Sequence, residues 1–137
     1  MPMVFSKALE PVEAGQVIEI HGKNEDSGRF DINLCAGDEE DSGEISLHIS
    51  VRFGDDCGEI VRNTCDEGGW GEEEITEENP VENNGDFKFT IKVGSNDFDI
   101  SIDGKHFCKY VFRRPLSEIK RLNIEGEVKQ IYEVKQS

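Results

Sequence analysis

The sequence predicts an all-β fold, an antiparallel β-sandwich of two sheets, and two observations lead to that prediction. Apolar and polar residues alternate with a period of two in five runs of the chain, as in strands that bury one face. Breaks rich in Gly, Asn and Asp separate the runs at short spacing, which is typical of sandwiches and barrels. The 137 residues suffice for one core, so we expect a single domain over residues 1–137.

The expected strands are named here by their apolar positions, in chain order. They are Ile18 and Ile20; Phe30, Ile32 and Leu34; Ile45, Leu47 and Ile49; Phe87, Phe89, Ile91 and Val93; and Phe98, Ile100 and Ile102. Asp103-Gly104 follows the last run and predicts a type I′ hairpin, because both central residues of that turn need positive φ. Helix is expected only over 115–120, as about one turn.

The charge balance restricts the possible partners. There are 15 basic and 30 acidic residues, a net charge of −15, which repels nucleic acid and anionic membrane surfaces. Acidic residues cluster at 38–41 and 72–78, and these runs are expected to be solvated loops. Calcium is the alternative because clustered carboxylates can coordinate it, but neither run has the pattern of an EF-hand loop.

The four cysteines show no metal-binding spacing, and we expect no cofactor or metal. Cys35, Cys57, Cys65 and Cys108 lack a C-x-x-C pair and form no zinc pattern with the three histidines. Residues 1–14 lack the features of a secretory signal, and no apolar stretch is long enough to insert in a membrane. We therefore expect a cytoplasmic protein with reduced thiols.

The 45–52 strand carries polar side chains on the face opposite the core. Its alternate residues share that face because side chains of a strand point to opposite sides in turn. They are Ser46, His48, Ser50 and Arg52. If the run 59–64 pairs antiparallel with this strand, Val61 and Asn63 lie on the same face. The pattern predicts a polar surface that can carry chemistry.

Trp70, the only tryptophan, is expected beside this surface. Gly68-Gly69 and Gly71 bracket it in a turn, where core residues seldom lie. The sequence therefore predicts an exposed aromatic plane, followed two and three residues later by Glu72 and Glu73.

These residue types suit a sugar. A sugar offers hydroxyls that donate and accept, together with C–H patches that stack on aromatic rings. Arg52 provides a planar fork of donors, Asn63 a donor and an acceptor, and Glu73 acceptors. In galactose the axial 4-hydroxyl leaves the opposite C–H face clear for stacking.

The motifs that contain these residues resemble the galectin family. The family pattern is H-x-N-x-R, then V-x-N, then W-G-x-E-x-R, and the chain has His48-Ile49-Ser50-Val51-Arg52, Val61-Arg62-Asn63 and Trp70-Gly71-Glu72-Glu73-Glu74-Ile75. Residues 29–34 match the family's R-F-x-I-N-L strand, and 103–106, 112–115 and 122–126 resemble later family segments. The resemblance implies a two-sheet galectin jelly roll and a lectin that binds β-galactosides of glycoproteins or glycolipids.

The resemblance also implies a role for each site residue. His48 and Arg52 would bind the galactose 4-hydroxyl and ring oxygen, Asn63 and Glu73 the 6-hydroxyl, while Trp70 would stack on the ring and Val61 line the floor. Ser50 occupies the place of the family's asparagine, and Ile75 that of its last arginine. These two departures predict weak or altered specificity.

Two other classes of function were weighed. An enzyme is not expected, because the acids near Trp70 share one short loop and no nucleophile–base pair is evident. A galectin-fold module that has lost sugar binding and binds proteins instead is the alternative, kept open by Ser50 and Ile75. Self-association as a homodimer and export without a signal peptide are further expectations from the resemblance.

Overall fold

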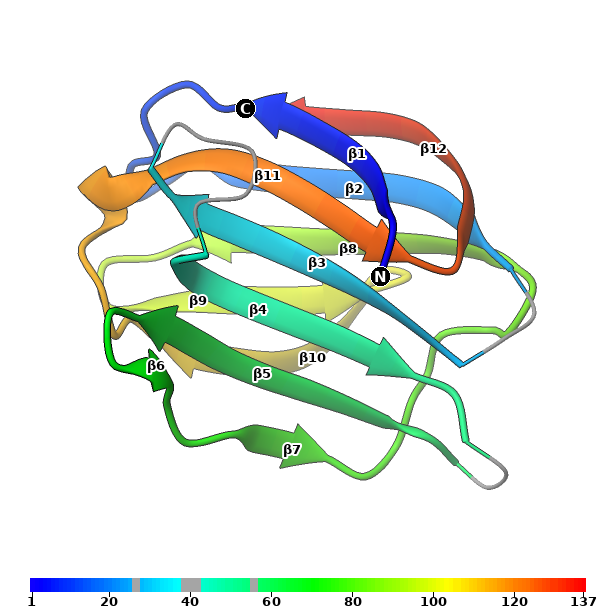
Figure 1. Ribbon diagram of the computed structural model, residues 1–137. Coiled ribbons are helices and arrows are strands. Elements are labelled where there is room, and N and C mark those ends of the chain that lie inside the picture. The colour runs from blue at the N-terminus through cyan, green and yellow to red at the C-terminus, as the bar shows by residue number, and fades with distance from the viewer. Residues whose placement is uncertain (26–27, 38–42, 55–56) are drawn as a thin grey trace.

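The computed structural model describes residues 1–25, 28–37, 43–54 and 57–137, which form two antiparallel sheets packed face to face (Figure 1). One sheet contains, in spatial order, β1 (Met3–Ala8), β11 (Ile119–Gly126), β3 (Arg29–Ala36), β4 (Ile45–Arg52), β5 (Glu59–Asp66) and β6 (Gly69–Trp70), and β7 (Glu74–Thr76) also pairs with β5. The other contains β10 (Lys105–Val111), β9 (Asp97–Ile102), β8 (Asp86–Val93), β2 (Val17–Asn24) and β12 (Val128–Gln136). The predicted antiparallel sandwich is confirmed.

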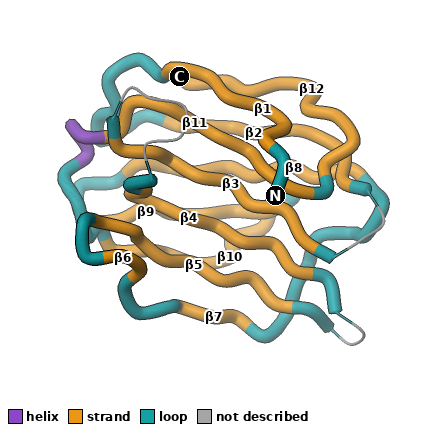
Figure 2. Tube along the Cα trace, viewed as in Figure 1, coloured by secondary structure: helices purple, strands orange, loops and turns teal. Residues whose placement is uncertain are grey.

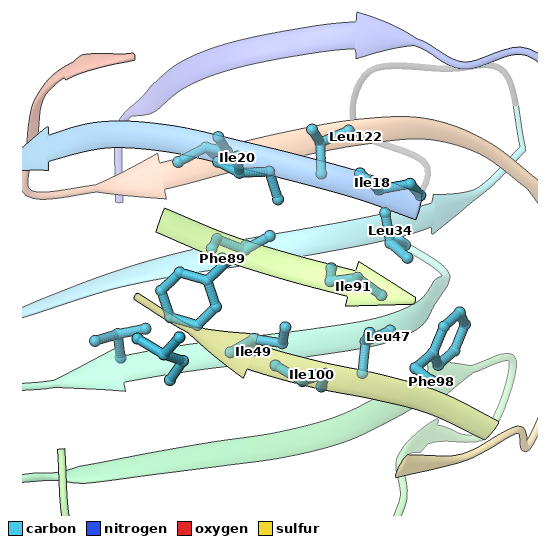
Figure 3. Packing of buried hydrophobic residues seen from close by; sticks show 14 of the residues in the cluster. Ile18, Ile20, Leu34, Leu47, Ile49, Phe89, Ile91, Phe98, Ile100 and Leu122 are labelled. Carbon is cyan, nitrogen blue, oxygen red and sulfur yellow. The ribbon is translucent and has the colours of Figure 1, made fainter. Parts of the chain in front are cut away.

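The core lies between the two sheets and is built from the alternating apolar residues. Figure 3 labels residues of this core that are each exposed by 2% or less: Ile18, Ile20, Leu34, Leu47, Ile49, Phe89, Ile91, Phe98, Ile100 and Leu122. Full burial of one such side chain stabilises the fold by about 1.5–3 kcal/mol. The period-two pattern therefore identified five of the strands, β2, β3, β4, β8 and β9, and, except at Ile45, the faces that they bury.

One expected core residue lies elsewhere. Ile45 is only partly buried and does not belong to the core cluster. It is the first residue of β4, and the register of β3 with β4 shifts between Leu34 and Cys35, opposite this point. The irregular pairing moves Ile45 away from the position that strict alternation gives it.

The expected turn and helix are both present. Asp103 and Gly104 have φ of 52° and 83°, as the type I′ hairpin between β9 and β10 requires. The helical segment is one 3₁₀ turn, Leu116–Glu118, and strand dominates the remaining regular structure (Figure 2). In the described part of the chain, no helix has the length and apolarity needed to cross a membrane.

The four cysteines form no disulfide, and the acidic run 72–78 is only partly the expected loop, because β7 covers Glu74–Thr76. All four cysteines are free, and burial raises the pKa of the Cys35 thiol to about 11. The acidic run Asp38–Asp41 and the pair Asp55-Asp56 lie outside the described residues. Within the described ranges, which include 72–78, no group of three or more His, Cys, Asp or Glu side chains is arranged to hold a metal ion.

Candidate functional site

The polar face of the first sheet brings the predicted site residues into two adjacent rows. His48 of β4 pairs with Asn63 of β5, and on its other side with Asn33 of β3. In the second row Ser50 pairs with Val61. β4 does pair antiparallel with β5, and this condition places Val61 and Asn63 on the face of the polar stripe of β4, which consists of Ser46, His48, Ser50 and Arg52.

An open pocket of about 320 Å³ lies on this face. Its lining residues are Arg29, His48, Arg52, Asn63, Trp70, Gly71 and Glu73. Five of the seven predicted site residues therefore meet in one pocket. Ser50 and Val61 do not line it, and both are buried, at 0% and 1% exposed.

The polar stripe is more enclosed than the alternation suggested. Ser46, His48 and Ser50 are each exposed by 6% or less, although they face away from the core. β4 lies inside the sheet between β3 and β5, so side chains of both neighbouring strands flank the stripe. The site is consequently a pre-organised polar layer in which His48 is only slightly accessible and Ser50 is fully buried.

Trp70 is the exposed aromatic side of the pocket. It is 53% exposed and lies on the two-residue strand β6, whose Gly69 has φ of 101°. The centre of its ring system lies 4.6 Å from that of His48. The prediction that Trp70 is exposed rather than part of the core is confirmed by this placement, while its stacking role stays a prediction.

His48 is held as a neutral ring with one free acceptor. Its Nδ1 lies 2.6 Å from Asn33 Oδ1. An amide oxygen can only accept, so the proton is on Nδ1 and the Nε2 lone pair is left for a ligand. Burial lowers the pKa of His48 to about 4, with the charges of Arg29 and Arg52 acting in the same direction and Asp31 opposing them.

Because His48 is buried and neutral, the free energy of unfolding is expected to decrease at acid pH. Its pKa rises from about 4 to about 6.5 on unfolding, so the unfolded state binds the proton more strongly between these values. Stability from this residue is complete above pH 6.5 and decreases as the pH falls toward 4. Between pH 7 and pH 5 the wild type should lose on the order of 2 kcal/mol more unfolding free energy than His48→Gln, measured by urea denaturation.

A matched control is His21→Gln, which removes an exposed histidine on β2. This variant should follow the wild type at both pH values. Equal losses in the wild type and in His48→Gln would contradict the assignment of the buried neutral imidazole.

Arg52 is oriented by its own strand and by β5. Its Nε donates to Ser50 Oγ at 3.1 Å, and its Nη1 contacts Glu59 Oε2 at 3.4 Å. Among the described residues, Glu59 is the carboxylate that contacts Arg52. Glu73 is exposed at the pocket and available to a ligand.

Asn63 connects the pocket to the Trp70 segment. Its Nδ2 donates to the Gly71 carbonyl at 2.9 Å, and its Oδ1 accepts from the Thr64 amide at 2.8 Å. The side chain is 3% exposed. Most of its hydrogen-bonding capacity therefore fixes the backbone beside Trp70, and the second Nδ2 hydrogen is the part left for a ligand.

Arg113 is a supporting residue that sequence reasoning did not single out. From the segment after β10 it donates to Asn63 Oδ1 at 3.0 Å, to the Glu72 carbonyl at 2.8 Å and to Glu74 Oε2 at 2.9 Å. A Cβ on Gly71 would lie 3.0 Å from Arg113 Nη1, so glycine there allows the close approach. These contacts fix the segment that carries Trp70 and Glu73.

Arg29 is the second residue whose place in the site was not predicted. It lines the pocket next to Arg52, its register partner, and binds Asp31 through Nε and Nη2 at 2.9 and 3.0 Å. The sequence identified Arg29 only as part of a strand motif. Its Nη1 is the donor that faces away from these bonds.

A larger pocket of about 450 Å³ lies elsewhere, between the segment 76–80 and the β9–β10 hairpin. It is lined by Thr76, Glu78, Pro80, Ile102, Asp103, Lys105, His106 and Phe107, and none of the predicted site residues contributes to it. We take the smaller pocket as the functional candidate because it alone joins an exposed aromatic plane to converging donors and acceptors.

An antiparallel sandwich with an open polar pocket and one exposed aromatic plane on a sheet face defines a lectin-type domain. The profile of the galactoside-binding lectin family matches residues 3–136. The chain belongs to this family, the galectins, which confirms the resemblance of its motifs.

Individual relatives agree with this assignment. A 32 kDa β-galactoside-binding lectin of Caenorhabditis elegans is 39% identical over 129 residues, which is 93% of this chain and 46% of the relative. Galectin-8 of Rattus norvegicus is 32% identical over 124 residues, 90% of this chain and 39% of the relative. The chain thus spans less than half the length of these curated relatives.

Solved structures share the fold. A variant of human galectin-16 superimposes with a TM-score of 0.87 at 24% identity, covering 100% of this chain and 99% of the other. Sheep galectin-11 gives a TM-score of 0.85 at 18% identity over the same shares. The described arrangement of two sheets is that of these galectins.

Proposed function

We propose that this domain binds β-galactosides on glycoproteins or glycolipids, without catalysing a reaction. The observation that carries the proposal is the single pocket in which Trp70, His48 and Arg52 converge. The names of the relatives from C. elegans and Haemonchus contortus, both β-galactoside-binding lectins, support the same ligand class.

In the proposed complex the axial 4-hydroxyl lies between His48 and Arg52. The hydroxyl donates to the free Nε2 of His48 and accepts from the guanidinium of Arg52, so one group satisfies both residues. The 6-hydroxyl lies near Asn63 and Glu73, where it donates to the carboxylate. The C–H face of galactose stacks on Trp70.

Specificity for galactose follows from this geometry. In glucose the 4-hydroxyl is equatorial and points away from the position between His48 and Arg52, which leaves a buried acceptor without a partner. A site built to bind a hydroxyl discriminates strongly against an analogue that does not supply it. We expect binding to be weak, with a Kd of about 1 mM, because an open groove buries little surface and two family contacts are replaced.

Retention on an immobilised galactoside column, followed by a glycan array, tests the proposal. Retention that free lactose or methyl β-galactoside reverses is the expected result. An array without galactose-terminated hits would favour the alternative, a galectin-fold module that binds proteins, since Ser50 and Ile75 both remove polar contacts of the family pattern.

Two further features of the proposal concern the whole protein. We propose that the protein is cytoplasmic and can also reach the extracellular space. The edge strands β1 and β12 offer backbone groups for a homodimer, and two linked sites would increase the avidity of a weak lectin for multivalent glycoproteins.

Removal of Arg113, which does not line the pocket, is expected to lower the affinity of the pocket for galactosides. Arg113→Ala removes three hydrogen bonds to Asn63, Glu72 and Glu74 and should lower galactoside affinity about tenfold, because the Trp70 segment loses its fixed position. Titration with lactose measures the affinity, and acrylamide quenching of Trp70 emission should increase. The control is Lys109→Ala, which removes the same charge at an exposed position of β10. Unchanged affinity and quenching in Arg113→Ala would contradict the positioning role.

A further inference from the structure

The short strand β7 places an apolar side chain on the face of the galactoside pocket. Ile75 is 48% exposed, one of the few large apolar residues with such exposure. It pairs with Val61, which lies on the same face of β5 as the pocket residue Asn63, two positions along the strand. Exposed apolar side chains cost little when scattered, but one beside a binding pocket is available to a ligand.

Its two chain neighbours fix the direction in which Ile75 points. Glu74 accepts from Arg113 at 2.9 Å, and Thr76 Oγ1 accepts from Arg62 Nη1 at 2.8 Å. Arg62 lies on the inner face of β5, opposite Val61, where its guanidinium is 5.5 Å from the ring centre of Phe107. Since side chains alternate along a strand, Ile75 lies on the pocket side, and both anchors hold it there.

The side chain at position 75 is apolar, and a neighbouring side chain is acidic. Ile75 cannot bond a hydroxyl, so a polar group placed over it must remain with water. Val61 lies beside it in register and adds no polar atom. The exposed carboxylate of Glu73, two residues before it, disfavours an anionic group.

We infer that Ile75 forms an apolar subsite next to the galactose pocket and that it selects galactosides whose neighbouring group is apolar and uncharged, such as an aryl aglycone. This inference rests on the proposed galactoside binding. An aryl group that covers Ile75 removes a few tens of Å² of apolar surface from water, which corresponds to a gain in affinity of about three- to tenfold over a methyl aglycone.

The test is an NMR titration of the ¹⁵N-labelled protein with methyl β-galactoside and phenyl β-galactoside. The ratio of the two dissociation constants reports the subsite, while the methyl galactoside alone reports the proposed function. Ile75→Gln removes the apolar contact at similar length. Val111→Gln makes a comparable change at another exposed position, on β10 of the second sheet, where Val111 is 63% exposed.

The expected result is a three- to tenfold preference for the phenyl galactoside, with shifts of the Ile75 and Val61 amides specific to that ligand. Ile75→Gln should bring the ratio close to one without changing the methyl galactoside affinity, and Val111→Gln should leave it unchanged. A ratio near one in the wild type, or a preference that persists in Ile75→Gln, overturns the inference while galactoside binding stands. Failure of methyl β-galactoside to bind overturns the proposed function and the inference together.

Discussion

Trp70→Ala is expected to abolish measurable galactoside binding while the protein remains folded. The side chain is 53% exposed on a two-residue strand, so the core loses little, whereas the pocket loses its aromatic side. Stacking is worth about 0.5–1.5 kcal/mol beyond the buried area, so its loss alone would raise a Kd of about 1 mM by about two- to thirteenfold, and the lost buried area raises it further.

The measurement is retention on a galactoside column, with circular dichroism and urea denaturation as tests of the fold. Trp70→Phe keeps an aromatic plane of smaller area and should retain part of the binding. A large loss of stability in Trp70→Ala would show that the side chain belongs to the fold and that the site is misplaced. Full retention of binding would contradict the stacking role.

The double variant Ser50→Asn with Ile75→Arg is expected to bind lactose about tenfold more tightly. An arginine on β7 would place a planar donor fork on the pocket side, close to the carboxylate of Glu73. Each new hydrogen bond contributes about 0.5–1.5 kcal/mol, and about 1.4 kcal/mol is a factor of ten. The same change should remove any preference for an aryl aglycone.

The single variants separate the two contributions. Ile75 is exposed, so Ile75→Arg should supply most of the gain. Ser50 is fully buried and accepts from Arg52, so an asparagine there must rearrange the neighbouring Asp31 and Arg29 before it reaches a sugar. Lactose affinity that is unchanged in both Ile75→Arg and the double variant would contradict the assignment of Ile75 to the pocket face.

Local pattern was enough to predict the fold and most of the pocket. A buried sheet face imposes a period of two on the sequence, so Leu47 and Ile49 could be assigned to the core and His48 to the opposite face. The glycines around Trp70 predicted its exposure, because a turn of this kind leaves a large side chain outside the core. Pairing of β4 with β5 then placed Asn63 beside His48.

What could not be predicted depends on contacts between distant segments. Arg113 reaches Asn63 across 50 residues of sequence, and no local pattern distinguishes such an arginine from a solvated one. Ile45 lies outside the core because β4 has an irregular register with β3, and alternation within one strand does not reveal such a register. The pocket side of Ile75 likewise became evident only from the pairing of β7 with β5.

Titration of the wild-type domain with methyl β-galactoside and its 4-epimer, methyl β-glucoside, tests the central claim most directly. Trp70 is the only tryptophan, so its emission reports the pocket without a label. We expect a saturable change with the galactoside, with a Kd of about 1 mM, and no saturable change with the glucoside. Equal responses to the two epimers, or no response to either, would contradict it.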